Sequence, residues 1–176
     1  DNPMIREEII RHIVQASGED PIVSTTGKAS RELFEIREHN GQSHKYDFLT
    51  VGSMGHSSSI ALGVAVQKPG TKVWCVDGDG AVLMHMGSLP DTLFLLPDAK
   101  QLGEVTVWGK SLGYPHAVSV ATYEELDREL TAAKERDALT FIEVKCGIGA
   151  REDLGRPTTT ALENKQNFME YLKNLG

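Results

Sequence analysis

The sequence predicts an α/β protein, with a doubly wound and mostly parallel sheet and helices on both of its faces. Two observations support this fold class. Short apolar runs of strand length alternate with stretches of helical periodicity along the 176 residues, and glycine-bearing loops follow three of the apolar runs. Such alternation is typical of parallel sheets with crossover helices. At this length we expect one domain, residues 1–176, with a sizeable core.

The first half of the chain alternates helices and strands. Apolar residues between Ile5 and Val14 fall on one helical face with charged residues opposite, and Gly18 ends that helix. The further elements expected in this half are strands at 21–25, 47–51 and 72–76 and helices at 29–38 and 57–67. Pro69-Gly70 marks a turn before the third strand.

The second half gives fewer signals. Thr122 and Glu125 match a capping box, which predicts a helix from there to about Glu135. The apolar run 139–144 predicts a strand, and 164–175 predicts a final helix. The glycines, proline and threonines of 147–160 are typical of an extended loop rather than a folded subdomain.

Composition argues against several classes of function. The formal net charge of -7 disfavours nucleic acid and anionic membrane surfaces as partners. Cys75 and Cys146 lie outside any Cys-x-x-Cys pair, so no zinc site is indicated and a reducing compartment is expected. Without a membrane-spanning apolar run or a signal peptide, we expect a cytoplasmic protein. Because the first residue is not Met, we also expect a piece of a longer chain.

The most informative segment is Asp77-Gly78-Asp79-Gly80, between the apolar run 73–76 and an expected helix. Its glycines let backbone N–H groups approach phosphate oxygens. The helix N-terminus adds unpaired donors and a positive dipole end. Asp79 offers a hard oxygen ligand for Mg²⁺ or Ca²⁺. The alternative is a plain strand-to-helix turn with an Asp N-cap.

Two further glycine loops favour a ligand site over a plain turn. Thr25-Thr26-Gly27 and the segment 52–56 each follow an expected strand, so all three loops occupy the carboxyl edge of the sheet, where ligands bind. Lys28 and Arg31 are the cations nearest to the first loop, and they are candidates for binding a phosphonate or carboxylate. The alternative for both is a solvated charge on the helix surface.

Four segments together resemble the diphosphate-binding domain of thiamine-diphosphate enzymes, most closely the phosphonopyruvate decarboxylase family, with the sulfopyruvate decarboxylases as near relatives. The segments are Thr25 to Leu33, Val51 to Ser57, Gly78 to Gly87, and Gly155 to Thr160 followed by Glu163-Asn164-Lys165. The Gly-Asp-Gly alone indicates only the superfamily. The Gly-Ser-Met-Gly-His loop and the Gly-Arg-Pro-Thr-Thr-Thr segment narrow the resemblance to the phosphonopyruvate and sulfopyruvate decarboxylases. The resemblance implies the thiamine-diphosphate-binding fold.

The resemblance implies a site for thiamine diphosphate and Mg²⁺. Asp79 would bind the Mg²⁺ that bridges the cofactor diphosphate. Backbone groups of Gly78, Gly80 and Ala81 would contact the same diphosphate, and Gly27 would let the first loop approach it.

The second loop would support the body of the cofactor. By the resemblance, Met54 would sit under the bent cofactor and hold its two rings in a V shape. Gly52, Ser53 and His56 would line the pocket near the thiazolium and the diphosphate. The alternatives are a core methionine for Met54 and a surface residue at a helix start for His56.

The family pattern also has a second metal-binding segment, a strand ending in paired asparagines before a glycine-rich loop, and this sequence lacks it. The interval between Gly87 and Lys110 is too short for the family's helix, strand and cofactor loop together. Because Lys110 to Tyr114 resumes the family pattern, we expect a segment to be missing from the sequence between about 89 and 110. The alternative is a true loss, which would leave metal binding to Asp79 and water.

The resemblance implies decarboxylation of a 2-oxo acid with a distal anion: 3-phosphonopyruvate, giving phosphonoacetaldehyde and CO₂, or in second place sulfopyruvate. No part of the chain resembles the family's pyrimidine-binding domain, which supplies the catalytic Glu, so no residue here is assigned as catalytic. We expect that domain on a longer chain or a second subunit, in a homo-oligomer with sites at subunit interfaces. A non-catalytic partner subunit is one alternative. A dinucleotide enzyme is disfavoured, because the first loop lacks Gly-x-Gly-x-x-Gly.

Overall fold

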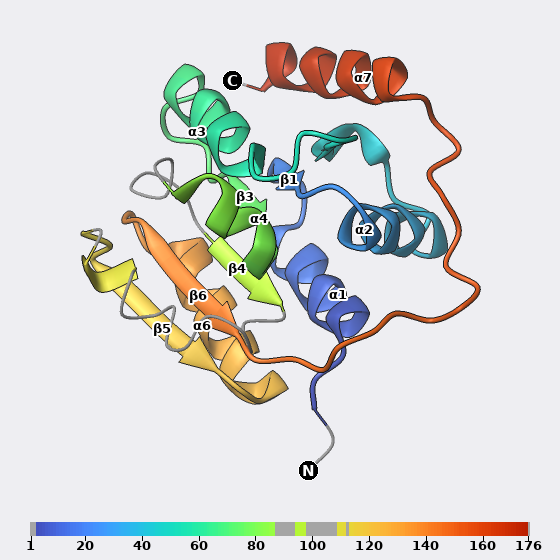
Figure 1. Ribbon diagram of the computed structural model, residues 1–176. Coiled ribbons are helices and arrows are strands. Elements are labelled where there is room, and N and C mark those ends of the chain that lie inside the picture. Colours follow the sequence, from blue (N-terminus) through green and yellow to red (C-terminus); the bar gives the residue numbers. More distant parts are fainter. Residues whose placement is uncertain (1–2, 87–93, 98–108, 112, 176) are drawn as a thin grey trace.

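A six-stranded parallel sheet organises the molecule (Figure 1). The computed structural model describes residues 3–86, 94–97, 109–111 and 113–175. The strands lie in the order β2-β1-β3-β4-β6-β5, and every pairing between them is parallel. Their bounds are β1 Ile22–Ser24, β2 Asp47–Leu49, β3 Trp74–Val76, β4 Phe94–Pro97, β5 His116–Val120 and β6 Thr140–Val144. The predicted fold class is therefore confirmed.

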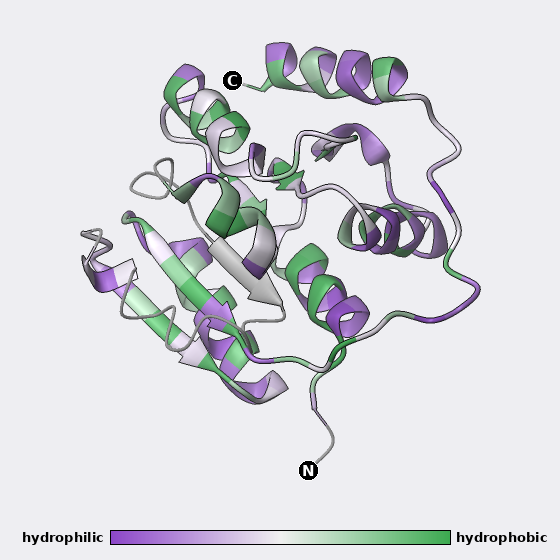
Figure 2. Ribbon diagram, in the orientation of Figure 1, coloured by the Kyte–Doolittle hydropathy of each residue, from purple (hydrophilic) through white to green (hydrophobic). Residues whose placement is uncertain are grey.

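Helices cover both faces of this sheet (Figure 1). Their bounds are α1 Arg6–Ser17, α2 Lys28–His39, η1 His44–Tyr46, α3 Ser57–Gln67, α4 Asp79–Met84, α6 Tyr123–Glu135 and α7 Ala161–Asn174. Residues of α1, α2 and α6 form one core with one face of the sheet, and residues of α3, α4 and α7 form a second core with the other face. In Figure 2 the ribbon of α1 carries both hydrophobic and hydrophilic residues, as expected of a helix that covers a core on one side.

Strand residues alternate between the two cores. Trp74 and Val76 of β3 pack in the first core, while Cys75 between them packs in the second. Side chains along a strand point to opposite faces in turn, and a parallel sheet covered on both faces therefore reads as a continuous apolar run. This explains why the strands appeared in the sequence without polar alternation.

The crevice for a ligand lies between β1 and β3. These strands are neighbours, yet the helix after β1 packs in the first core and the helix after β3 packs in the second. The connections after β1 and β3 thus run toward opposite edges of the sheet, to β2 and to β4. Open α/β sheets bind ligands at such a point. The loops Thr25–Gly27 and Asp77–Gly78 both start there.

The structure corrects the predicted start of the last helix. The sequence predicted residues 164–175, whereas α7 begins at Ala161. Thr160 is the N-cap and forms a capping box with Glu163, so each satisfies a backbone N–H of the other. The strands β4 and β5 were not predicted from the sequence. The segment expected to be missing between 89 and 110 falls mostly outside the described residues.

A buried ion pair joins α2 to β2. Arg37 donates to both carboxylate oxygens of Asp47, at 2.9 Å each, and the two side chains are 0% and 1% exposed. Burial raises the pKa of Asp47, and the hydrogen bonds and positive charge of Arg37 partly offset that rise. Because the carboxylate has no access to water, its ionised form depends on Arg37.

Replacing Arg37 with Met should therefore destabilise the protein strongly. The change leaves a buried carboxylate unpaired, and we expect a loss of roughly 3–5 kcal/mol in the free energy of unfolding measured by urea titration. Arg128→Met, at a side chain that is 68% exposed, should cost less than about 0.5 kcal/mol. The double variant Arg37→Met/Asp47→Leu should recover most of the loss. A single-variant cost below about 1 kcal/mol would contradict this role.

Candidate functional site

Three loops meet at the carboxyl edge of the sheet, where β1, β2 and β3 end. Hydrogen bonds hold their bases together: the N–H of Thr25 donates to the Val76 carbonyl at 2.8 Å, and the Thr50 hydroxyl donates to the Ser24 carbonyl at 2.9 Å. Further out, the N–H of Gly52 donates to the hydroxyl oxygen of Thr26 at 3.2 Å. The predicted convergence of these loops is present.

The buried carboxyl of Asp77 connects all three loops. Its side chain accepts a hydrogen bond from the Ser57 hydroxyl of α3 at 2.7 Å and one from the Gly78 N–H at 3.0 Å. The Thr25 side chain of the first loop also hydrogen-bonds it. Burial raises the pKa of Asp77, and the bonds from Ser57, Thr25 and Gly78 partly lower it again. The Asp77 carboxyl is therefore a structural group, buried behind the rim of the site.

A cavity of about 240 Å³ lies where the loops meet. Its lining comes from the first loop and the start of α2, from the second loop, and from the start of α4. The lining residues are Arg6, Thr25, Thr26, Lys28, Ala29, Met54, Gly78, Asp79, Gly80 and Ala81. Asp79 is half-buried at the first position of α4, and one of its carboxylate oxygens accepts from the Gly80 N–H at 2.7 Å. The cavity thus combines a partly exposed carboxylate, basic side chains and the start of a helix.

Glycine allows the second loop to lie closely against α4. Met54 is 43% exposed, and its Cε would lie 3.1 Å from a Cβ added at Gly80. Gly55 has a φ of +89°, and its added Cβ would lie 2.9 Å from the Ala81 carbonyl oxygen. Side chains at these glycines would push the loop and the helix apart.

The structure brings together some of the predicted site residues and not others. Those that share the cavity are Lys28, Met54, Gly78, Asp79, Gly80 and Ala81. Gly27 and Arg31 line a neighbouring cavity instead. Gly52, Ser53 and His56 belong to the second loop but do not line the first cavity, and the His56 ring lies 4.4 Å from the ring of His85. The roles of these residues remain predictions.

Sequence reasoning missed two parts of this site. Arg6 of α1 lines the cavity and donates to both carboxylate oxygens of Glu32, at 2.8 and 2.9 Å. No local spacing connects these two residues, because they lie 26 positions apart on different helices. The bond between Ser57 and Asp77 was missed for the same reason. The apolar strand before Asp77 was the one usable signal, because it indicates that the Asp77 carboxyl is buried and needs a hydrogen-bond donor.

The donor set around Asp79 fits a phosphate-bound magnesium ion rather than a closed protein metal site. Among the described residues, no three His, Cys, Asp or Glu side chains are grouped so that they could hold a metal. Mg²⁺ commonly uses one or two carboxylates, water and ligand phosphates, and this requirement suits a single carboxylate at the start of a helix. The second metal-binding segment of the family pattern would fall outside the described residues.

Comparison with known proteins identifies the domain. Residues 25–94 match the family model described as "Thiamine pyrophosphate enzyme, C-terminal TPP binding domain". Over these residues the chain is similar to that family. The match covers all three loops of the site, and Asp79 and Met54 lie within it.

Relatives of the TPP-binding domain fall into two groups. Phosphonopyruvate decarboxylase from Streptomyces viridochromogenes is 30% identical over 171 residues, covering 86% of this chain and 42% of the relative. The beta subunit of sulfopyruvate decarboxylase from Methanocaldococcus jannaschii is 40% identical over 93 residues, covering 52% of this chain and 46% of the relative. The chain thus spans less than half the length of these curated relatives.

A solved structure supports the fold of the TPP-binding domain. Benzoylformate decarboxylase from Polynucleobacter necessarius matches 85% of this chain and 34% of its own, with a TM-score of 0.68 and 14% identity. At that identity the likeness concerns the fold alone. Within the described residues, no helix has the length and apolar character needed to cross a membrane.

Substituting Gly55 by Ala should test the close contact between the second loop and α4. The positive φ and the contact with the Ala81 carbonyl predict a loss of roughly 1–3 kcal/mol in the free energy of unfolding, measured by urea titration. Gly63 is a matched control, because it lies within α3 with no described atom within 4 Å of an added Cβ. Gly63→Ala should stabilise by about 0.4–1 kcal/mol. Equal effects of the two changes would exclude the tight contact.

Proposed function

We propose that this chain is the diphosphate-binding part of a thiamine-diphosphate-dependent decarboxylase. Its substrate would be a 2-oxo acid with a distal anion, first of all 3-phosphonopyruvate, and the products would be phosphonoacetaldehyde and CO₂. The observation that carries the proposal is the cavity between the three loops. It places Asp79, the start of α4 and Met54 together, within the residues that match the family model.

The chain's own residues would anchor the cofactor. Asp79 would bind Mg²⁺ at the diphosphate, and the backbone N–H groups at the start of α4 would donate to its oxygens. Lys28 would add positive charge around the cavity. Met54 would support the cofactor body from the side of the second loop. When bound, thiamine diphosphate supplies the electron sink for the carbanion that loss of CO₂ creates.

Two features of the relatives support a partner for this domain. The chain covers 42% of the phosphonopyruvate decarboxylase, and the sulfopyruvate decarboxylase relative is named as a beta subunit. We infer that a pyrimidine-binding domain, on a longer chain or on a second subunit, completes the active site in a homo-oligomer. That domain would supply the catalytic acid.

Sulfopyruvate is the second candidate substrate. The sulfopyruvate decarboxylase beta subunit has the higher identity, 40%, but over 52% of the chain, whereas the phosphonopyruvate decarboxylase aligns over 86%. The wider coverage favours phosphonopyruvate. A non-catalytic partner subunit is the further alternative, and loss of the paired asparagines would favour it.

Asp79→Asn should abolish the magnesium dependence of thiamine diphosphate binding. Removal of a carboxylate ligand should weaken cofactor affinity by more than about 100-fold, since even outer-shell partners of metal ligands contribute roughly 10- to 100-fold. Isothermal titration of the complete natural polypeptide with thiamine diphosphate, at several Mg²⁺ concentrations, measures this effect.

Asp137→Asn is a matched control for that titration. Asp137 is exposed between α6 and β6, away from the three loops, and its substitution should leave the affinity unchanged. If the wild-type protein binds the cofactor and Asp79→Asn binds it equally well, Asp79 is not the anchor. If the wild type binds no thiamine diphosphate, the decarboxylase proposal fails and the non-catalytic alternative stands.

A further inference from the structure

Among the described residues of this acidic chain, two arginines have no partner for their side chains. The sequence contains eight arginines and has a net charge of -7. Six of them contact an acidic side chain or a hydroxyl: Arg6, Arg11, Arg37, Arg128, Arg136 and Arg151. The side chains of Arg31 and Arg156 form no hydrogen bond or ion pair with any residue that the structure describes.

Both unpartnered arginines line the same cavity. This second cavity, of about 310 Å³, lies beside the cofactor cavity, and Thr26 lines both. No carboxylate occurs among the described residues that line it. Two like charges that share a cavity without a counterion repel each other, and the natural resolution is a bound anion.

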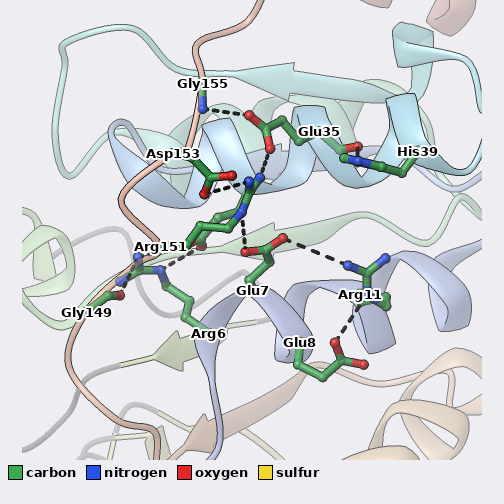
Figure 3. A network of polar contacts seen from close by, with 11 residues as sticks. Arg6, Glu7, Glu8, Arg11, Glu35, His39, Gly149, Arg151, Asp153 and Gly155 are labelled. Carbon is green, nitrogen blue, oxygen red and sulfur yellow. Dashed lines mark hydrogen bonds and ion pairs between the residues drawn. The ribbon is translucent and has the colours of Figure 1, made fainter.

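The ion-pair network in Figure 3 fixes Gly155, the residue before Arg156, to Glu35 of α2. Arg151 pairs with Glu7 of α1, at 2.9 Å, and with Glu35 of α2. The other Glu35 oxygen accepts from the N–H of Gly155 at 2.6 Å. Glu35 lies one turn after Arg31 on α2, so this anchor brings the residue after Gly155 close to Arg31.

The far end of the same segment is fixed to β2. Asn164 of α7 accepts from the Leu49 N–H at 3.0 Å and donates to the Asp47 carbonyl at 2.9 Å. Figure 1 shows the segment 147–160 running along the outside of α1 and α2 to reach α7. Held at both ends, the segment forms one wall of the cavity and presents Arg156, Pro157 and Thr159 to it.

Two of the four hydroxyl side chains that line the cavity, those of Ser30 and Thr50, donate within the protein. The Ser30 hydroxyl donates to the Thr25 carbonyl at 2.6 Å, and the Thr50 hydroxyl donates to the Ser24 carbonyl at 2.9 Å. Their protons are thus already used within the protein. Each guanidinium group presents a fork of N–H donors, and one such fork is enough to bind the two oxygens of a carboxylate. Two guanidinium groups therefore suit a tetrahedral oxyanion with three oxygens better than a carboxylate.

We propose that Arg31 and Arg156 together bind the distal tetrahedral oxyanion of the substrate, a phosphonate or a sulfonate, in the cavity next to the cofactor site. The substrate assignment rests on the proposed function, whereas oxyanion binding by the two arginines does not. The pair then determines specificity: it selects 2-oxo acids that carry a distal tetrahedral oxyanion over pyruvate, which has none.

Inorganic phosphate is the probe for the first arm of the test. The complete natural polypeptide is titrated with phosphate by calorimetry, with and without saturating thiamine diphosphate and Mg²⁺. Phosphate should still bind to the cofactor-loaded protein, because the second cavity stays open. Arg31→Gln and Arg156→Gln should each weaken it by about tenfold or more, and the double variant should lose it. Arg128→Gln, with the same charge change on α6, should have no effect, and urea unfolding checks that each variant is folded.

Steady-state decarboxylation forms the second arm. The double variant should raise KM for 3-phosphonopyruvate or sulfopyruvate by about 100-fold or more, with little effect on pyruvate turnover. Comparison of the two substrates shows which oxyanion is preferred.

The arginine site is overturned if the double variant binds phosphate as well as the wild type does, or if thiamine diphosphate displaces the phosphate. Lost phosphate binding with unchanged KM overturns the substrate assignment alone. If the wild type does not bind thiamine diphosphate, the proposed function fails while the cofactor-free phosphate titration still decides the arginine site.

Discussion

The buried carboxyl of Asp77 is the interaction on which the site depends. It follows β3 directly and receives hydrogen bonds from Thr25 of the first loop, from Gly78 of its own loop and from Ser57, the first residue of α3 after the second loop. A buried carboxylate without these donors would be strongly destabilised, so each loop has one position that satisfies it. These hydrogen bonds link the bases of the loops, and Asp79 follows two residues later at the start of α4.

The start of α2 places positive charge next to these loops. The first turn of α2 contains no acidic residue and carries Lys28 and Arg31 at the positive end of the helix dipole. Such placement is unfavourable for the isolated helix and favourable next to anions. Lys28 lines one cavity and Arg31 the other, so a single helix start would serve both of the proposed anion sites. An acidic chain thus concentrates unpaired positive charge at its sheet edge.

Much of the fold was predictable, because it depends on local patterns. The boundaries of α3, the strand before Asp77 and the glycine loops all follow from apolar runs and glycine positions close in sequence. Long-range contacts were not predictable in the same way. The bidentate contact of Arg6 with Glu32 and the anchoring of Gly155 on Glu35 join residues 26 and 120 positions apart. Arg156 therefore appeared in the sequence only as part of a family segment, and its place beside Arg31 required the structure.

The central claim is that the cavity between the three loops holds the diphosphate of thiamine diphosphate. A crystal structure of the complete natural polypeptide with thiamine diphosphate and Mg²⁺ tests it most directly. The diphosphate should lie between the first loop and the start of α4, with the metal ion bound by the Asp79 carboxylate. A cofactor bound elsewhere on the molecule, with Asp79 contacting neither metal nor phosphate, would contradict it.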